Sequence, residues 1–332
     1  MQNLNRRQFL RGTAQSLAFG LCASSIGLPA LTRAQAASLS WANLMPGFTI
    51  LISEYLRAKG LDKEYRLNLQ KPTTYASVGT YYNDFIAGNY DVCIGSWDTF
   101  AARYLAGVKV QFVCGISTGS MINILTPSGG EGTLEALKGK IFAAPQSSGT
   151  YRMMRAVIKE LHDIDLEQYM RVQNVDNPAA AVTLAMADRA DAVLSWEPNI
   201  SAGLVKAPDM RVLYNAGDEY RKRLGKELPY FGIAVRREVA ERDPELVQRL
   251  DQAFGACVNG IMGDVDEAVG LTAERSGFPP EVLKLAITSG RMALKHLSMG
   301  TPDGRDAVRT AAGFLIRNGS LPRQLDDGFF AV

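Results

Sequence analysis

The sequence is poor in histidine, which limits the chemistry that it supports. The 332 residues include two histidines, His162 and His296, both expected in amphipathic helices and neither near a cysteine or carboxylate pattern that would hold a metal. No histidine is placed to serve Ser147 or Ser148 as a base, and these serines lack the glycine-flanked turn of a hydrolase. The sequence therefore predicts no catalytic residue, no metal ligand and no cofactor, and we do not expect an enzyme.

Cysteine is also scarce, with four in the chain. Cys22 lies near the N-terminus, and the other three, Cys93, Cys114 and Cys257, stand in apolar segments without a close cysteine neighbour. An odd number of separated cysteines argues against a disulfide framework, so we expect buried thiols.

Long uncharged runs are missing except at the N-terminus, between Gly12 and Thr32. This run follows Arg6 and Arg7 in "NRRQFLR", which resembles a twin-arginine export signal, and it ends before the small-residue pattern "AQA". Residues 1–36 are therefore predicted to be a signal peptide, with the mature protein exported to the periplasm. The segment carries four arginines and no acid, so the formal charge changes from +2 to −2 on its removal (+2 − 4), and a nucleic-acid surface is not expected.

The stretch "IFAAPQSSGTYRMMRAVI" has one glycine and no lysine in its turn, which excludes a nucleotide phosphate loop. Its small residues would nevertheless leave backbone N–H groups bare at the start of a helix, a position that suits an anion. The ordinary alternative is that Ser147 or Ser148 only caps the helix.

Predicted strands alternate with predicted helices, which indicates an α/β fold with mostly parallel sheets. Extended segments near 117–125 and 228–235 cross between two such units, and the chain beyond the second crossing is expected to be helical. We therefore predict two lobes, with residues 37–120 and 230–332 in the first and 121–229 in the second, and a cleft at the carboxyl ends of the strands.

The loops at those strand ends carry the candidate ligand-binding residues. All three tryptophans are among them, which suggests an apolar wall, and the hydroxyl and amide side chains offer neutral hydrogen bonds. The candidates are Trp41, Asn43, Tyr75, Ser96, Trp97, Thr99, Ser147, Ser148, Gly149, Thr150, Trp196 and Glu197. Glu197 is expected to anchor structure or ligand rather than to catalyse, and a ligand contact by Arg152 or Arg236 is left open.

Three segments resemble the periplasmic substrate-binding proteins of ABC importers for nitrate, sulfonates and taurine, with the related thiamine-precursor binders. They are "LKGKIFAAPQSSGTYRMMRAVI", "ADAVLSWEP" and "GIAVRREVAERDPELVQRLDQAF". The resemblance covers nearly all of the mature chain. It implies a type II periplasmic-binding fold whose two lobes close on a hinge, with ligand contacts at the candidate loops.

The resemblance also implies a role and partners. We expect a monomeric solute receptor that delivers its ligand to the permease and ATPase subunits of an importer. The aromatic residues Trp97 and Tyr75 favour an organic anion, such as a sulfonate or an aromatic acid, over nitrate. A sensor subunit, or a receptor for a pyrimidine or thiamine-precursor solute, remains an alternative.

Overall fold

The computed structural model describes residues 38–45 and 47–331, all within one compact unit, Ala36–Val332. The predicted signal peptide, with Cys22, lies outside the described residues. Among the residues that are described, no helix combines the length and apolar character needed to span a bilayer. The lobe boundaries predicted from the sequence remain a prediction, because residues 38–331 form a single unit by their contacts.

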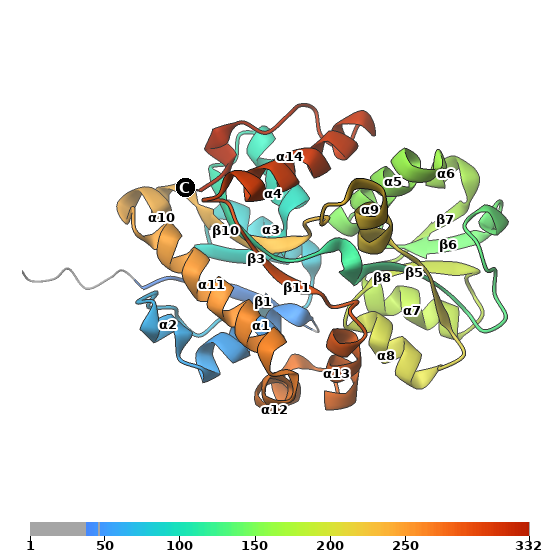
Figure 1. Cartoon of the computed structure of the whole chain (residues 1–332), viewed down its shortest axis with the longest axis horizontal. Coiled ribbons are helices and arrows are strands. Elements are labelled where there is room, and N and C mark those ends of the chain that lie inside the picture. Colours follow the sequence, from blue (N-terminus) through green and yellow to red (C-terminus); the bar gives the residue numbers. More distant parts are fainter. Residues whose placement is uncertain (1–37, 46, 332) are drawn as a thin grey trace, which may run out of the picture. The chain divides into compact units, whose positions relative to one another are not determined.

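The first large sheet has four strands in the order β11–β4–β10–β3 (Figure 1). Their bounds are β3 (Val92–Ser96), β4 (Val110–Ser117), β10 (Phe231–Arg236) and β11 (Leu294–Ser298). A short parallel pair, β1 (Ala42–Leu44) and β2 (Thr73–Tyr75), lies beside it, because Trp41 bridges to Val92.

The second large sheet has five strands in the order β7–β6–β8–β5–β9. Their bounds are β5 (Ile122–Thr126), β6 (Ile141–Ala144), β7 (Arg171–Asn174), β8 (Ala192–Trp196) and β9 (Arg211–Asn215). The neighbours of β6 are parallel to it, and those of β5 are antiparallel to it.

Helices pack against both sheets, with α4 on β4 and β10, α11 on β4 and β11, and α7 on β6 and β8. Several begin at a side chain that accepts from the first turn, such as Ser148, Asn177 and Asp264. The bounds are α1 (Phe48–Ala58), α2 (Leu61–Glu64), α3 (Val78–Ala87), α4 (Trp97–Leu105), α5 (Gly149–His162), α6 (Leu166–Tyr169), α7 (Pro178–Met186), α8 (Asn199–Lys206), α9 (Ala216–Leu224), α10 (Arg237–Arg242), α11 (Leu246–Gly263), α12 (Val265–Ser276), α13 (Pro280–Thr288) and α14 (Pro302–Arg317).

The prediction of mostly parallel sheets is wrong, because the strand pairings of the first sheet are antiparallel and those of the second are half parallel and half antiparallel. The returning strand β10 inserts between β3 and β4 and is antiparallel to both. Gly232 makes this insertion possible, because a Cβ at this position would lie 2.2 Å from the carbonyl oxygen of Cys114. The alternation of strands and helices therefore predicted the elements, but the sequence pattern did not show where the returning strand would pair.

The expectation of an all-helical C-terminal part is also wrong, since β11 forms an edge strand there. Its sequence, "LKHLS", is short, half-buried and polar, so it lacks the apolar run that predicts a strand. His296 lies in this strand and not in the helix expected for it. In the N-terminal part, the segment "YRLNLQ" alternates like a strand but forms only a bridge, between Leu39 and Leu69.

The two segments that cross between the sheets lie side by side. Thr118 bridges to Pro229, the Gly119 N–H donates to the Leu228 carbonyl at 2.7 Å, and the Tyr230 N–H donates to the Ser117 carbonyl at 3.0 Å. These are the segments that the sequence predicts to cross between the two units.

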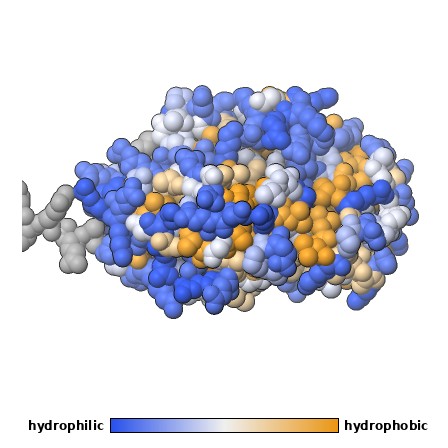
Figure 2. Space-filling view, turned by 60° about the horizontal axis from the view of Figure 1, so that its bottom comes forward, coloured by the Kyte–Doolittle hydropathy of each residue, from blue (hydrophilic) through white to orange (hydrophobic). Residues whose placement is uncertain are grey.

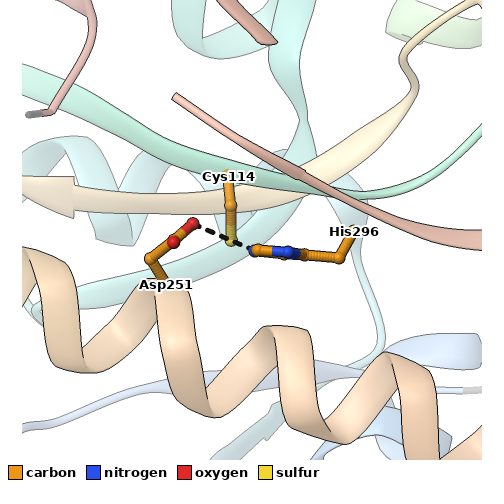
Figure 3. A group of neighbouring side chains, drawn as sticks. All are labelled: Cys114, Asp251 and His296. Carbon is orange, nitrogen blue, oxygen red and sulfur yellow. Dashed lines mark hydrogen bonds and ion pairs between the residues drawn. The ribbon is translucent and has the colours of Figure 1, made fainter. Parts of the chain in front are cut away.

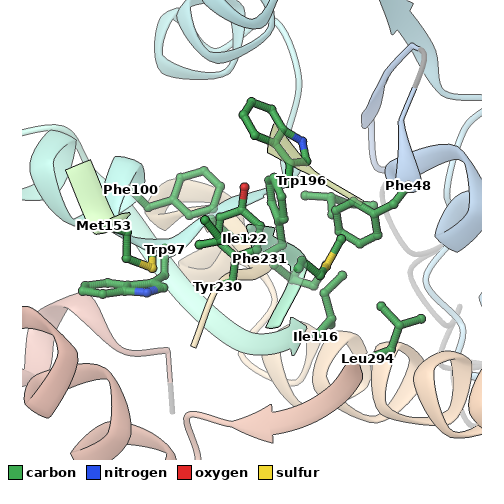
Figure 4. Packing of buried hydrophobic residues seen from close by; sticks show 14 of the residues in the cluster. Phe48, Trp97, Phe100, Ile116, Ile122, Met153, Trp196, Tyr230, Phe231 and Leu294 are labelled. Atoms are coloured by element: carbon green, nitrogen blue, oxygen red, sulfur yellow. The ribbon is translucent and has the colours of Figure 1, made fainter. Parts of the chain in front are cut away.

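The main hydrophobic core joins residues of both sheets and their helices. Trp97, Met153, Tyr230 and Phe231 belong to this cluster (Figure 4), although they come from α4, α5 and the second crossing segment. Figure 2 shows that hydrophobic residues also gather in patches on one face, between hydrophilic residues. The main core therefore bridges the two sheets, and a smaller separate cluster, which includes Leu125, Ala143 and Val193, packs on the second sheet.

The insertion of β10 predicts a strong effect of Gly232→Ala. Its Cβ would meet the Cys114 carbonyl oxygen at 2.2 Å and the Phe112 ring at 2.4 Å, so we expect a loss of about 3 kcal/mol in unfolding free energy from overpacking. The control is Gly270→Ala in α12, which has open space and should gain about 0.5–1 kcal/mol. Denaturant unfolding measures both; equal effects would contradict the close approach.

Candidate functional site

A cavity of about 660 Å³ lies where the strand ends of the two sheets face each other. Its wall takes residues from the segments after β1, β3, β6, β7 and β8, together with α3 and β10. Most of the residues predicted from the sequence lie in this wall: Ser96, Thr99, Ser147, Ser148, Gly149, Thr150 and Trp196. Arg152, which the sequence analysis left open, lies there as well, whereas Arg236 does not.

The start of α5 forms one end of the cavity. Ser148 caps the helix by accepting from the Tyr151 N–H at 3.1 Å, so the ordinary capping role is present. The cap satisfies one backbone N–H of the first turn. The N–H groups of Gly149 and Thr150 donate no hydrogen bond to any described residue. These two donors, at the positive end of a helix of 14 residues, provide attraction for an anion in the cavity.

A fully buried carboxylate, Asp98, holds α4 against the start of α5. Arg152 donates to its Oδ2 from Nε at 3.1 Å and from Nη2 at 2.8 Å, and Ser96 donates to its Oδ1. A Cβ at residue 149 would meet Asp98 Oδ1 at 2.3 Å, so only glycine fits there. Gly149 is thus required by packing as well as being a wall residue.

Arg152 is held in place by more than Asp98. Its Nη2 also donates to the Thr99 hydroxyl at 3.1 Å, and its Nη1 lies 3.4 Å from the Ser147 carbonyl. The side chain stays 27% exposed, and Arg152 is one of the residues that line the cavity. An oriented, partly exposed arginine is suited to recognise a carboxylate or a sulfonate.

The charge of the wall has one sign. Among the described residues that line the cavity, two are arginines, Arg103 and Arg152, and none is aspartate or glutamate. The sequence analysis missed Arg103, although its position four residues after Thr99 puts both on one face of α4. The cavity therefore favours an anionic ligand.

Aromatic rings make up much of the remaining wall. Trp196 lines it with 9% of its surface exposed, and Phe48 and Phe231 are in contact with each other at a centroid distance of 4.8 Å. Thr150 is hydrogen-bonded to the hydroxyl of Tyr230, which ties α5 to the second crossing segment. The sequence analysis did not select Phe48, Tyr82, Asn177, Asn199 or Phe231, and their places after β1, β7 and β8 or on α3 and β10 are evident only in the fold.

The other predicted tryptophans point into the core instead of the cavity. The Trp41 indole donates to the Gln70 carbonyl at 2.6 Å, and the Trp97 indole donates to the Pro229 carbonyl at 2.9 Å. Both side chains are almost completely buried, and neither lines the cavity. Their polar ends are satisfied by backbone from distant segments, so the structure gives them packing roles.

Asn43 and Tyr75 also lie outside the cavity wall. Asn43 donates to the Ser53 hydroxyl at 2.7 Å and is buried, and the Tyr75 hydroxyl donates to Asp84 at 2.7 Å. The Asp84 hydrogen bond and burial together raise the pKa of Tyr75 to about 12. The predicted contribution of the Tyr75 loop comes instead from its neighbours Ala76 and Val78.

Glu197 belongs to a buried ion pair and not to the cavity wall. Arg291 Nε donates to its Oε1 at 2.6 Å, while Ser201 donates its N–H to Oε2 at 3.0 Å and its hydroxyl to Oε1 at 2.9 Å. Burial raises the pKa of the Glu197 carboxyl, and Arg291 and Ser201 oppose that rise. The pair joins the end of β8 to the segment before β11, which is a structural role.

One of the two histidines also differs from expectation in its surroundings. His162 at the end of α5 contacts the Tyr214 hydroxyl at 3.1 Å, and it belongs to no potential metal-binding group found among the described residues. His296, however, lies beside Asp251 and Cys114, which corrects the expectation that neither histidine is near a cysteine or a carboxylate. Cys93, Cys114 and Cys257 are buried free thiols, and burial raises the pKa of each.

Comparison with solved structures identifies the fold. The periplasmic aliphatic sulphonate binding protein SsuA from Escherichia coli superposes with a TM-score of 0.71 at 16% identity, covering 88% of this chain and 91% of that one. The alkanesulfonate-binding protein SsuA from Xanthomonas axonopodis pv. citri, bound to MOPS, gives 0.68 at 17% identity, covering 87% and 96%. No protein-family model matches the sequence, and no curated protein matches it either.

A further similar structure states the fold in its description. The Candida albicans CA3427 gene product, described as having the generic periplasmic binding protein structural fold, gives a TM-score of 0.57 at 14% identity and covers 87% of this chain and 98% of that one. The fold of residues 38–331 is therefore that of the periplasmic binding proteins.

The Glu197–Arg291 pair predicts a matched difference in stability. Glu197→Ala leaves Arg291, whose side chain is 17% exposed, without its partner, so we expect a loss of about 3 kcal/mol. Glu160→Ala removes a more exposed pair with Arg317 and should cost less than about 1 kcal/mol. Denaturant unfolding compares them; a smaller loss for Glu197→Ala would contradict the buried-pair interpretation.

Proposed function

We propose that this protein is the solute-binding component of an ABC importer and that it captures a small organic anion of the sulfonate type without catalysing a reaction. The observation that carries the proposal is the cavity wall, which among its described residues combines Arg103, Arg152 and two N–H groups without an acceptor, and includes no acidic side chain. An anion placed there would gain charge-assisted hydrogen bonds in a partly desolvated setting.

The size and apolar character of the cavity support an organic ligand. A volume of about 660 Å³ lies in the range of small-molecule sites, roughly 300–1,000 Å³, and exceeds the need of an inorganic anion such as nitrate. Trp196, Phe48 and Phe231 provide apolar surface for a carbon skeleton, while the start of α5 and Arg152 would take the acidic group.

The similar structures support the same ligand class. The proteins from Escherichia coli and Xanthomonas axonopodis pv. citri are described as sulfonate-binding, and the latter as bound to MOPS. A third structure, a putative periplasmic sulfonate-binding protein SsuA from Methylobacillus flagellatus KT, has a TM-score of 0.61 at 16% identity, covering 88% of this chain and 92% of that one.

The proposal includes a working cycle and a location. The protein would be exported to the periplasm by the twin-arginine signal, act as a monomer, and close over its solute by movement at the two crossing segments near Gly119 and Leu228. Contacts that the solute makes with both sheets only in the closed form would drive closure. The closed receptor would then deliver the solute to the permease and ATPase subunits.

A thermal-shift screen of the purified protein tests the ligand class. We expect alkanesulfonates and arylsulfonates to raise the melting temperature, with about 2.7 kcal/mol of stabilisation at a hundredfold excess over the dissociation constant. The panel also holds aromatic carboxylates, taurine, nitrate, pyrimidines and flavins. Tight binding of nitrate with no melting-temperature shift for any organic anion would contradict the proposal. The absence of a shift with every compound in the panel would contradict it as well.

A graded series of arginine variants tests the anion contact. Arg152→Lys keeps a charge beside Asp98 but loses the planar fork, so we expect sulfonate affinity to fall about tenfold or more. Arg103→Gln removes a rim charge and should reduce affinity up to about fivefold. Arg223→Gln, an exposed arginine outside the cavity, should change nothing. Isothermal calorimetry measures all three; equal affinities would contradict the contact.

A further inference from the structure

Three side chains that are far apart in the sequence meet outside the cavity, between α11 and the first sheet. Cys114 comes from β4, Asp251 from α11 and His296 from β11, and their potential ligand atoms all lie within 4.8 Å of one another. Figure 3 shows the Cys114 sulfur beside the hydrogen bond that joins Asp251 to His296. None of the three lines the cavity.

The strand register explains how these residues meet. Ser298 pairs with Cys114 across β11 and β4, and His296 precedes Ser298 by two residues. The side chains of Cys114 and His296 therefore belong to the same face of the sheet as that of Ser298. The pairing of β11 with β4 shifts by one residue between Leu294 and Leu297, an irregularity that includes His296. Such irregularities re-aim side chains.

Helix α11 supplies the third group and the space for the ring. It packs against β4 and β11, and Asp251 and Gly255 lie four residues apart on the same side of the helix. A Cβ at residue 255 would lie 3.1 Å from His296 Nδ1 and Cε1, so glycine lets the imidazole approach the helix. With Nδ1 against Gly255, the other nitrogen, Nε2, faces Asp251.

The geometry does not suit a nucleophilic relay. In a relay the imidazole stands between the acid and the nucleophile and uses one nitrogen for each. Here Asp251 Oδ1 lies 3.0 Å from Nε2, and the Cys114 sulfur lies beside that same hydrogen bond. The three donor atoms therefore converge on one point instead of forming a chain.

We propose that Cys114, Asp251 and His296 bind a zinc ion with three protein ligands and one open position. Thiolate, imidazole and carboxylate are the groups that zinc prefers, and three such ligands leave a fourth tetrahedral position for water. On binding, the ion forms bonds to sulfur, Nε2 and a carboxylate oxygen. The thiol proton leaves to solvent, and the proton between Nε2 and Asp251 leaves to solvent or moves to Nδ1, so that the bound imidazole is neutral with its one proton on Nδ1.

The burial of the three side chains would allow a zinc ion to be held while solvent still reaches it. Cys114 is completely buried, whereas the side chains of His296 and Asp251 are 24% and 21% exposed, so solvent reaches one side of the cluster. The ion would fasten the edge strand β11 to β4 and α11. Since binding to the folded state alone stabilises a protein, we expect zinc to raise the melting temperature.

Cobalt and zinc titrations of the purified, metal-free protein in a non-chelating reductant test the proposal. Cobalt should give a thiolate-to-metal charge-transfer absorption at one equivalent, and zinc should displace it. Cys114→Ser, Asp251→Asn and His296→Gln should each weaken zinc binding by more than about a hundredfold, because even outer-shell partners are worth about 10- to 100-fold. Sulfonate binding should persist in all three variants, since none of these residues lines the cavity.

The cysteine controls are Cys257→Ser, which removes another buried thiol from α11, and Cys93→Ser, which removes the buried thiol of β3. Both should bind cobalt and zinc as the unchanged protein does. The proposal would be overturned if cobalt gave no thiolate absorption. It would also be overturned if the absorption were lost in one of the controls but kept in Cys114→Ser. If Cys114→Ser does not fold, the zinc affinities of Asp251→Asn and His296→Gln test the proposal, since both of these side chains are partly exposed. Unchanged zinc affinity in both variants would overturn it.

Discussion

The buried carboxylate of Asp98 is the constraint on which the site depends. A charge with no exposed surface is tolerated only where partners satisfy it, and here these are Arg152 and Ser96. This requirement brings α4 from the first sheet against α5 from the second, and it excludes any side chain at Gly149. The position of the α5 N-terminus at the cavity thus follows from the need to pair the buried Asp98 carboxylate with Arg152 and Ser96.

The same arrangement keeps the acidic side chains in buried ion pairs and leaves an arginine partly exposed at the cavity wall. The acids near the cavity, Asp98 and Glu197, are both fully buried and paired with arginines, so neither contributes negative charge to the wall. Arg152 serves both purposes, because it neutralises Asp98 and remains partly exposed. Among its described residues, the wall that results contains arginine but no acid, and it is rich in hydrogen-bond donors and aromatic carbon, which is the physical basis for proposing an organic anion.

The sequence predicted the elements and many wall residues because strand ends in α/β sheets gather at one edge. It could not predict side-chain direction, since Trp97 turns inward to a carbonyl 132 residues away. The insertion of β10 and the edge strand β11 depend on long-range pairing that short patterns do not record. The cluster of Cys114, Asp251 and His296 was missed for the same reason, as its members come from three separate elements.

A crystal structure of the protein with a bound alkanesulfonate is the most direct test of the central claim. We expect the sulfonate oxygens within hydrogen-bond distance, roughly 2.7–3.2 Å, of the Gly149 and Thr150 N–H groups, with the carbon chain against Trp196. A sulfonate found away from the start of α5, or a cavity that stays empty at saturating ligand, would contradict it.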